Sequence, residues 1–331
     1  MLRFILRRLL ILIPTLILIS IITFAIIQLP PGDFLTSYVA ALTTTGEVTN
    51  EAEIEYLREQ YGLNKPVYVQ YLKWMSGAVR GDFGESFAMG RPVKDLIWER
   101  LALTVALTMA SILVTWIIAI PIGIYSATHQ YKFFDHLFTF LGFVGMATPA
   151  FLLALVLMYL LYAYFGVSIG GLFSPAYLDA PWTLGKVADL LKHLIVPVIV
   201  LAVGSTAGLI RTLRANLLDQ LEMPYVVTAR AKGLPYWRLV LKYPVRIAIN
   251  PMISTIGWML PGLVSGSVIV SLVMDLPTTG PLLLTALMDQ DMYLAGTFIM
   301  LLSVLTVIGT LISDILLVWV DPRIRFEGKR A

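Results

Sequence analysis

The sequence contains no cysteine, which excludes disulfide bonds, thiol nucleophiles and cysteine-ligated metals. Its three histidines, His129, His136 and His193, lie near the borders of apolar segments and do not show the spacing of a metal site. We therefore expect neither a metal ion nor another cofactor.

The sequence also lacks a phosphate-binding loop of the form Gly-x-x-x-x-Gly-Lys-Ser/Thr. Because such a loop holds the nucleotide phosphates, the chain is not expected to be an enzyme that hydrolyses ATP, and any ATP would be hydrolysed by a partner. The segment of residues 211–246 contains tyrosine, lysine and arginine, a mixture that nucleic-acid-binding regions also show, but it lies between two apolar runs. Membrane topology and a protein partner explain it more simply than nucleic-acid binding does.

Charged residues are scarce: they make up 14% of the chain, against roughly 25% in soluble proteins, while hydrophobic residues make up 58%. This composition predicts an all-α, polytopic membrane protein in contact with the lipid bilayer. Six runs supply the roughly 20 residues that a membrane helix needs. The fourth does so by including Leu190, Leu191 and also Lys192 and His193, whose polar ends can extend to the interface. The runs cover residues 9–32, 101–128, 137–165, 194–210, 247–274 and 292–313.

The two ends of the chain are expected to lie in the cytoplasm. Residues 1–30 should form a cytoplasmic N-terminus and a retained first transmembrane helix, because the apolar run is longer than a signal-peptide core and lacks a small-residue cleavage site. Lysine and arginine concentrate at both termini and in residues 211–246, which assigns these parts to the cytoplasmic side. The tail of residues 321–331 then shares that side.

Residues 31–100 form one long extracytoplasmic loop region in this topology. An amphipathic helix is predicted after Pro66, and its apolar positions are Tyr68, Leu72, Met75 and Val79. A turn at residues 81–84 follows. The region is either a solvated cap over the spans or a docking surface for an external delivery protein.

The predicted spans contain almost no ionisable residues. The candidate for a charged group within a span is Asp314, near the cytoplasmic end of the last span, where it would form a structural ion pair or, alternatively, take part in transport. A proton- or sodium-coupled carrier normally has carboxylates near the middle of the membrane. Their scarcity favours energy supplied from outside the membrane.

Small residues and prolines interrupt the spans, and such residues permit kinks and close helix contacts. Most are expected to be packing features. A weakly charged lining from the third and fifth spans would nevertheless suit a translocation pathway, for which the candidate residues are Thr148, Pro149, Ser265 and Ser267.

The connection at about residues 214–250 holds the most informative segment. Gly233, followed by Pro235, predicts the end of a short helix. Small residues would let another backbone approach closely, and Arg230 and Lys232 offer charge to it. The pattern favours a helix held in a socket of a second protein; the alternative is an ordinary basic cytoplasmic loop. The positions at helical spacing are Tyr225, Thr228, Ala229 and Lys232.

Residues 225–234, Tyr-Val-Val-Thr-Ala-Arg-Ala-Lys-Gly-Leu, resemble the coupling helix of permease subunits in binding-protein-dependent ABC importers, specifically the first permease of the dipeptide and oligopeptide branch. The general superfamily pattern begins Glu-Ala-Ala, whereas Val227-Thr228-Ala229 stand here. No salt bridge from that glutamate position to an ATPase is therefore expected. Further similarity to the branch lies in Pro31-Gly32-Asp33, Gly81-Asp82-Phe83-Gly84 and Asp321-Pro322-Arg323, so that it covers nearly the whole chain.

The resemblance implies a type I ABC importer permease (MetI-like) fold with six transmembrane helices, a core over residues 101–320, and a place in the cell membrane of a prokaryote. It implies a second permease subunit, one or two ABC ATPase subunits and an extracytoplasmic substrate-binding protein as partners. The implied substrate is a di- or oligopeptide; an oligosaccharide or opine importer of the same architecture and, more distantly, a secondary carrier are the alternatives. The implied ATPase-coupling residues are Tyr225, Thr228, Ala229, Arg230, Ala231, Lys232, Gly233 and Leu234.

Overall fold

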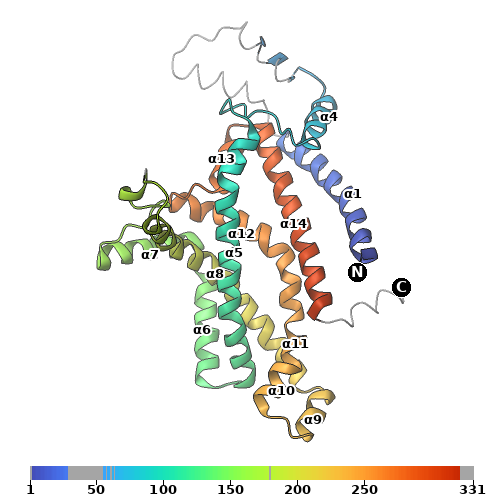
Figure 1. Cartoon of the computed structure of the whole chain (residues 1–331), viewed down its shortest axis with the longest axis vertical. Coiled ribbons are helices and arrows are strands. Elements are labelled where there is room, and N and C mark those ends of the chain that lie inside the picture. Colours follow the sequence, from blue (N-terminus) through green and yellow to red (C-terminus); the bar gives the residue numbers. More distant parts are fainter. Residues whose placement is uncertain are drawn as a thin grey trace. The chain divides into compact units, whose positions relative to one another are not determined.

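The computed structural model describes residues 2–28, 55–56, 58–59, 62, 64–178 and 180–320. Within these residues the regular secondary structure is helical, apart from one isolated bridge between Glu85 and Pro92, which confirms the all-α prediction (Figure 1). The motifs at residues 31–33 and 321–323 lie outside the described residues. The chain divides into two compact units, Met1–Leu103 with Thr278–Leu305, and Thr104–Pro277 with Thr306–Ala331.

The first unit contains α1 (Leu2–Ile27), α4 (Val67–Ala78), α13 (Thr279–Met288) and the beginnings of α5 (Val93–Thr128) and α14 (Met292–Val320). Trp74 of α4 is almost fully buried against Phe24 of α1, and the Ser20 and Tyr71 hydroxyl groups form a 2.8 Å hydrogen bond. A second apolar cluster joins the start of α5 to α13 and α14. Helices distant in sequence are thus held together by aromatic and aliphatic packing.

The helix predicted after Pro66 is present as α4, but the prediction of its apolar face is wrong at three of its four positions. Tyr68, Leu72 and Val79 are exposed, whereas Trp74 is buried and both Met75 and Tyr71 are half-buried against the same cluster. Tyr71 and Trp74 face the core because their rings bury a large apolar area against Phe24. Tyr71 packs edge-on against Phe24, with 5.4 Å between the ring centroids.

The second unit is built around α8 (Leu184–Leu221), whose Leu213 and Leu217 are fully buried. Its other elements are α6 (Phe133–Ala147), α7 (Ala150–Phe165), η1 (Pro175–Tyr177), α9 (Pro224–Ala231), α10 (Tyr236–Lys242), α11 (Pro244–Ala248), α12 (Asn250–Val273) and the remainders of α5 and α14. One hydrophobic core draws residues from α5, α8, α9, α10, α11 and α12. The short helices after α8 are therefore part of the same packed body as the long ones.

The long apolar helices agree with the predicted spans. By length and composition α5, α8 and α14 can each cross a membrane, and α6 with α7 makes a fourth candidate if the bent pair is one span. The first and fifth predicted runs coincide with α1 and α12, whose described parts include the apolar segments Ile13–Ile26 and Val264–Val273.

The third predicted span is not one straight helix. The chain bends by 103° between α6 and α7, at Thr148 and Pro149. Proline disfavours a helical conformation in the residue before it, and Thr148 is accordingly extended, with φ −84° and ψ 119°. A run of apolar residues alone does not reveal such a break.

The helix at the fourth run is longer than predicted, because charged residues at its start are satisfied by the preceding loop. Lys186 is buried and donates hydrogen bonds to the carbonyl oxygens of Leu178 and Ala180, at 3.2 and 2.6 Å. Asp189 accepts hydrogen bonds from the backbone and hydroxyl of Ser174, both at 2.7 Å. With these groups paired, α8 begins at Leu184, before the predicted start at Leu190.

Candidate functional site

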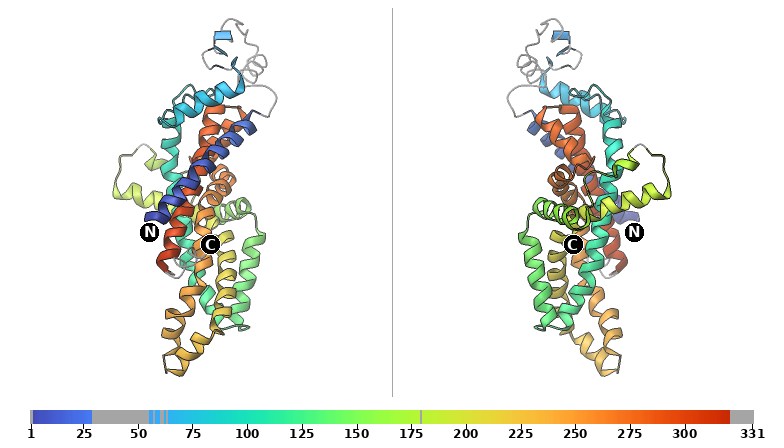
Figure 2. Two further views of the ribbon diagram at one scale, coloured as in Figure 1. Left: turned by 90° about the vertical axis from the view of Figure 1, so that its right-hand side faces the viewer. Right: turned by 90° about the vertical axis from the view of Figure 1, so that its left-hand side faces the viewer.

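The predicted cytoplasmic helix is present as α9. It begins at Pro224, where proline suits the first helical position because its missing N–H would have no partner there. Gly233 follows it with φ +75°, the left-handed conformation predicted for the residue that ends the helix. Figures 1 and 2 show α9 and α10 as a short projection at one end of the second unit.

One face of α9 anchors it to the spans. Val226 and Ala229 are buried in the core that contains Leu213 and Leu217 of α8. The Tyr225 hydroxyl donates a 2.7 Å hydrogen bond to the Gln220 side chain in the last turn of α8. Of the predicted coupling residues, Tyr225 and Ala229 therefore hold the helix in place and Leu234 is half-buried against the same core.

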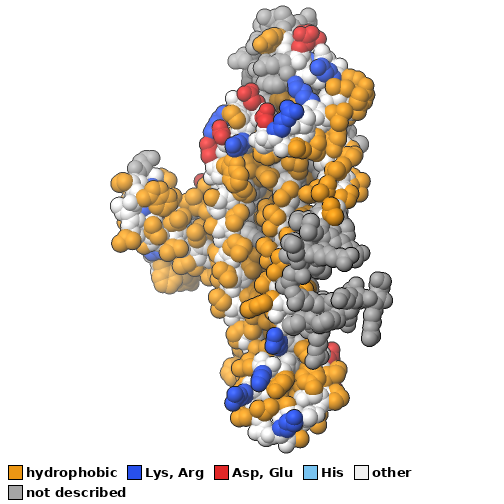
Figure 3. Space-filling model, turned by 45° about the vertical axis from the view of Figure 1, so that its right-hand side comes forward, with side chains coloured by type: hydrophobic (Ala, Val, Ile, Leu, Met, Phe, Trp, Pro, Cys, Tyr) orange, Lys and Arg blue, Asp and Glu red, His pale blue; other side chains and the backbone are white. Residues whose placement is uncertain are grey.

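The opposite face of α9 and the turn after it are exposed. Figure 3 shows lysine and arginine side chains gathered on this projection. Helical spacing explains the division, because residues 226 and 229 share one face and their neighbours point away from it. We call the exposed set the coupling surface; it consists of Val227, Thr228, Arg230, Ala231, Lys232 and Gly233.

Sequence reasoning missed two apolar members of this region. Val227 is 58% exposed and Trp237 of α10 is 50% exposed. The signal for Val227 was available, since two adjacent valines on a helix cannot both face the core. Exposed apolar side chains beside basic ones are a combination typical of a protein contact.

The four predicted pathway residues are not brought together by any contact in the described structure. Thr148 and Pro149 form the bend between α6 and α7, where the Thr148 hydroxyl donates to the Val144 carbonyl at 2.8 Å. Ser265 is exposed on α12, whereas Ser267 is buried and donates to the Val264 carbonyl at 2.8 Å. Their role in translocation stays a prediction.

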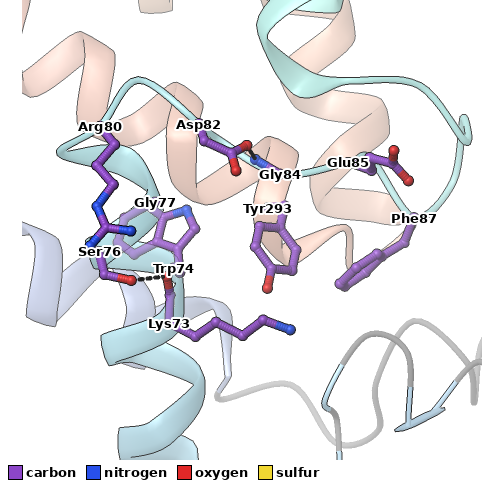
Figure 4. Close-up of a pocket in the computed structure, with 10 residues that line it drawn as sticks. All are labelled: Lys73, Trp74, Ser76, Gly77, Arg80, Asp82, Gly84, Glu85, Phe87 and Tyr293. Atoms are coloured by element: carbon purple, nitrogen blue, oxygen red, sulfur yellow. Dashed lines mark hydrogen bonds between the residues drawn. The ribbon is translucent and has the colours of Figure 1, made fainter.

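A cavity of about 370 Å³ lies in the first unit, between α4 and the segment that follows it (Figure 4). The predicted turn builds its wall: Gly84 has φ +75°, and a Cβ atom there would lie 2.7 Å from the Tyr293 ring. Its lining combines the basic Lys73 and Arg80 with the acidic Asp82 and Glu85. The cavity adds a polar, indented patch to the region predicted to be extracytoplasmic.

Asp291, just before α14, fastens the same segment. Its buried carboxylate accepts hydrogen bonds from the Ser86 hydroxyl at 2.5 Å, the Ala88 N–H at 3.2 Å and the Leu294 N–H at 3.0 Å. Burial raises the pKa of the Asp291 carboxyl above its usual value, although these hydrogen bonds act in the opposite direction. No local pattern predicted this role, because Ser86 and Asp291 are 205 residues apart.

Comparison with known families identifies the class of protein. Residues 119–326 match the family described as “Binding-protein-dependent transport system inner membrane component”, and residues 1–108 match its N-terminal counterpart, “Binding-prot-dependent transport system membrane comp, N-term”. The chain therefore belongs to this family, the permease subunits of binding-protein-dependent ABC importers, and is a multi-pass membrane protein.

Individual relatives are similar over nearly their whole lengths. The oligopeptide transport system permease protein AppB of Bacillus subtilis (strain 168) is 38% identical over 98% of this chain and 99% of the relative. The probable D,D-dipeptide transport system permease protein DdpB of Escherichia coli (strain K12) is 33% identical over 94% of both. The glutathione transport system permease protein GsiC of the same strain is 32% identical over 99% of this chain and 100% of the relative.

Proposed function

We propose that this chain is the subunit through which a peptide, released by an extracytoplasmic binding protein, crosses the cell membrane when partner ATPases hydrolyse ATP. The observation that carries the proposal is α9: one face is fixed in the core of the spans, and the other presents the coupling surface to a partner. A helix anchored in this way moves with α8 as one body, so that motion of the ATPases reaches the membrane.

The coupling surface fits an ATPase groove by its shape and charge. Thr228, Ala231 and Gly233 are small and permit close backbone approach, while Arg230 and Lys232 supply positive charge. The absence of a phosphate-binding loop from the sequence supports the assignment of ATP hydrolysis to other subunits. The second permease and the binding protein complete the proposed assembly, with the latter docking on the extracytoplasmic loop region and its cavity.

Peptides are the proposed substrate class because the relatives named above are permeases of oligopeptide, D,D-dipeptide and glutathione systems. The test is uptake into vesicles that contain the chain with its second permease and ATPases, with the binding protein outside. A labelled dipeptide or tetrapeptide should enter and a labelled trisaccharide should not. Uptake of the trisaccharide alone would replace the peptide assignment by the oligosaccharide alternative.

The proposed orientation places α4 outside the cell and α9 inside it. Since the native chain has no cysteine, single cysteines can be introduced without background. A cysteine at Val79, which is 80% exposed, should react with an impermeant maleimide in intact cells. A cysteine at Arg230 should react after the membrane is opened. Labelling of both positions in intact cells would contradict this topology.

A further inference from the structure

An ion pair between a half-buried arginine and a buried carboxylate joins α6 to α8. The Arg214 guanidinium donates two hydrogen bonds to the Asp135 carboxylate, from Nε to Oδ1 and from Nη2 to Oδ2, both at 2.9 Å. The Tyr131 N–H donates a third, also at 2.9 Å, from the turn between α5 and α6. Asp135 is only 2% exposed, so water does not screen this contact from its side.

The pair connects two parts of the second unit that the proposed function requires to move together. Arg214 lies about two turns before the end of α8, which leads directly into α9 and the coupling surface. Asp135 lies in the first turn of α6, whose other end is the bend at Thr148 and Pro149. A displacement of α9 can thus pass through the end of α8 and the Arg214–Asp135 ion pair to α6, the helix that ends at this bend.

Elsewhere α6 and α8 are in contact through close packing at small residues and through Arg211, whose guanidinium lies 5.6 Å from the centroid of the Phe143 ring. A Cβ atom on Gly145 would lie 2.8 Å from Val203, and one on Gly142 would lie 3.4 Å from Ala207, so small residues let the two helices approach closely. Such van der Waals packing has little directional preference. A bidentate arginine–carboxylate contact, in contrast, fixes both the distance between the two groups and their relative orientation.

The turn that carries Asp135 is itself held by this carboxylate. Tyr131 has φ +63°, an uncommon conformation for a residue other than glycine, and its N–H is the group that binds Asp135. The carboxylate therefore sets the α5–α6 turn and receives Arg214 at one point. Loss of its charge would weaken both contacts, because an amide keeps only one acceptor oxygen and accepts less strongly than a carboxylate.

We propose that Asp135 and Arg214 are positioning residues for transport: their ion pair transmits the movement of the α9 coupling surface to α6. This inference rests on the proposed function, since it assumes that ATPases act on α9. Without the pair, ATPases still bind and hydrolyse ATP, but fewer substrate molecules cross the membrane for each ATP hydrolysed.

The test uses the complete transporter in vesicles and compares Asp135→Asn, Arg214→Gln, the double variant and Arg214→Lys. Uptake per ATP hydrolysed should fall about tenfold in both single variants and in the double variant, the size of a typical coupling between sites. Arg214→Lys keeps the charge but loses the two-pronged geometry, and should fall between wild type and Arg214→Gln. ATPase subunits should still co-purify with all four.

The double variant separates transmission from stability. Arg214→Gln leaves the buried Asp135 carboxylate unpaired, whereas removal of both charges is often tolerated, so the double variant should resist heat better than Arg214→Gln. If the pair only stabilises the fold, the double variant will regain normal uptake per ATP, and the proposal is overturned. Parallel loss of ATPase binding and uptake in the single variants would also overturn it.

A matched control is the exposed Arg91–Glu99 pair, with 2.6 Å between Nη2 and Oε1. Glu99→Gln breaks an arginine–carboxylate pair of similar length outside the second unit and should leave uptake per ATP unchanged. If wild type itself shows no ATP-driven uptake, the proposed function fails; if wild type transports and the double variant matches it, the inference about Asp135 and Arg214 fails alone.

Discussion

Replacement of Gly233 by valine is expected to abolish uptake while the protein still inserts into the membrane. Gly233 has φ +75°, a conformation that costs residues with a Cβ roughly 1–2 kcal/mol and β-branched residues more. Among the described residues, apart from its two chain neighbours, no atom lies within 4 Å of a Cβ built there, so the backbone conformation and not a clash is the cause. The turn after α9 should change shape and the ATPases should dissociate. Co-purification of the ATPases and uptake in vesicles measure this.

Two further variants show whether the conformation or the position matters. Gly233→Asn should retain most activity, because asparagine tolerates the left-handed region. Gly166→Val introduces the same backbone conflict at φ +65° after α7, away from the coupling surface, and should leave ATPase binding intact. Normal assembly and uptake in Gly233→Val would mean that the segment is an ordinary cytoplasmic loop.

Replacement of Asp291 by alanine is expected to loosen the segment that contains Ser86 and Ala88. The change leaves several buried donors without an acceptor, and each such group costs about 1–3 kcal/mol. A local loss of roughly 3 kcal/mol raises the open population about 100-fold, which limited proteolysis from the external side detects. Asp82→Ala is the control, since Asp82 accepts one exposed hydrogen bond, from Gly84. Equal proteolysis of Asp291→Ala and wild type would contradict this role.

The stability of this segment is also expected to depend on pH, through the Asp291 carboxyl group. The pKa of Asp291 is raised in the folded protein, so the folded state holds the proton more tightly than the unfolded state does. This segment should therefore become more stable as the pH falls from above the raised pKa of the folded state toward the pKa of an unfolded aspartate, about 3.9. It should become less stable as the pH rises again. Proteolysis should be faster at neutral than at mildly acidic pH in wild type. Asp291→Asn, which cannot ionise, should lose this dependence.

Local signals predicted the elements whose structure is determined locally. The end of α9 followed from Gly233 and Pro235, and the start of α4 from Pro66, because turn and cap preferences belong to a few adjacent residues. The buried face of α4 did not follow, since Trp74 packs against Phe24, 50 positions away in the sequence. Helical spacing identifies candidate faces, and the packing partner selects one of them.

The polar contacts between distant segments were also beyond prediction. Asp135 lies two residues before the third apolar run and 79 residues from Arg214, so neither periodicity nor composition indicates their pairing. The start of α8 at Leu184 was not predicted either, because the sequence does not show that the preceding loop satisfies the charged Lys186 and Asp189. The sequence pattern predicted the helix that carries the proposed coupling residues, but it did not separate the anchored Tyr225 and Ala229 from the exposed positions.

An assay that identifies the energy source for peptide uptake tests the proposed function directly. Vesicles should contain this chain with its second permease and ATPases, and the binding protein should be loaded with labelled peptide outside. Uptake should require ATP inside the vesicle and should persist when ionophores collapse the ion gradients, and the purified chain alone should hydrolyse no ATP. Peptide uptake driven by a proton or sodium gradient without the ATPases, or ATP hydrolysis by the isolated chain, would contradict the account.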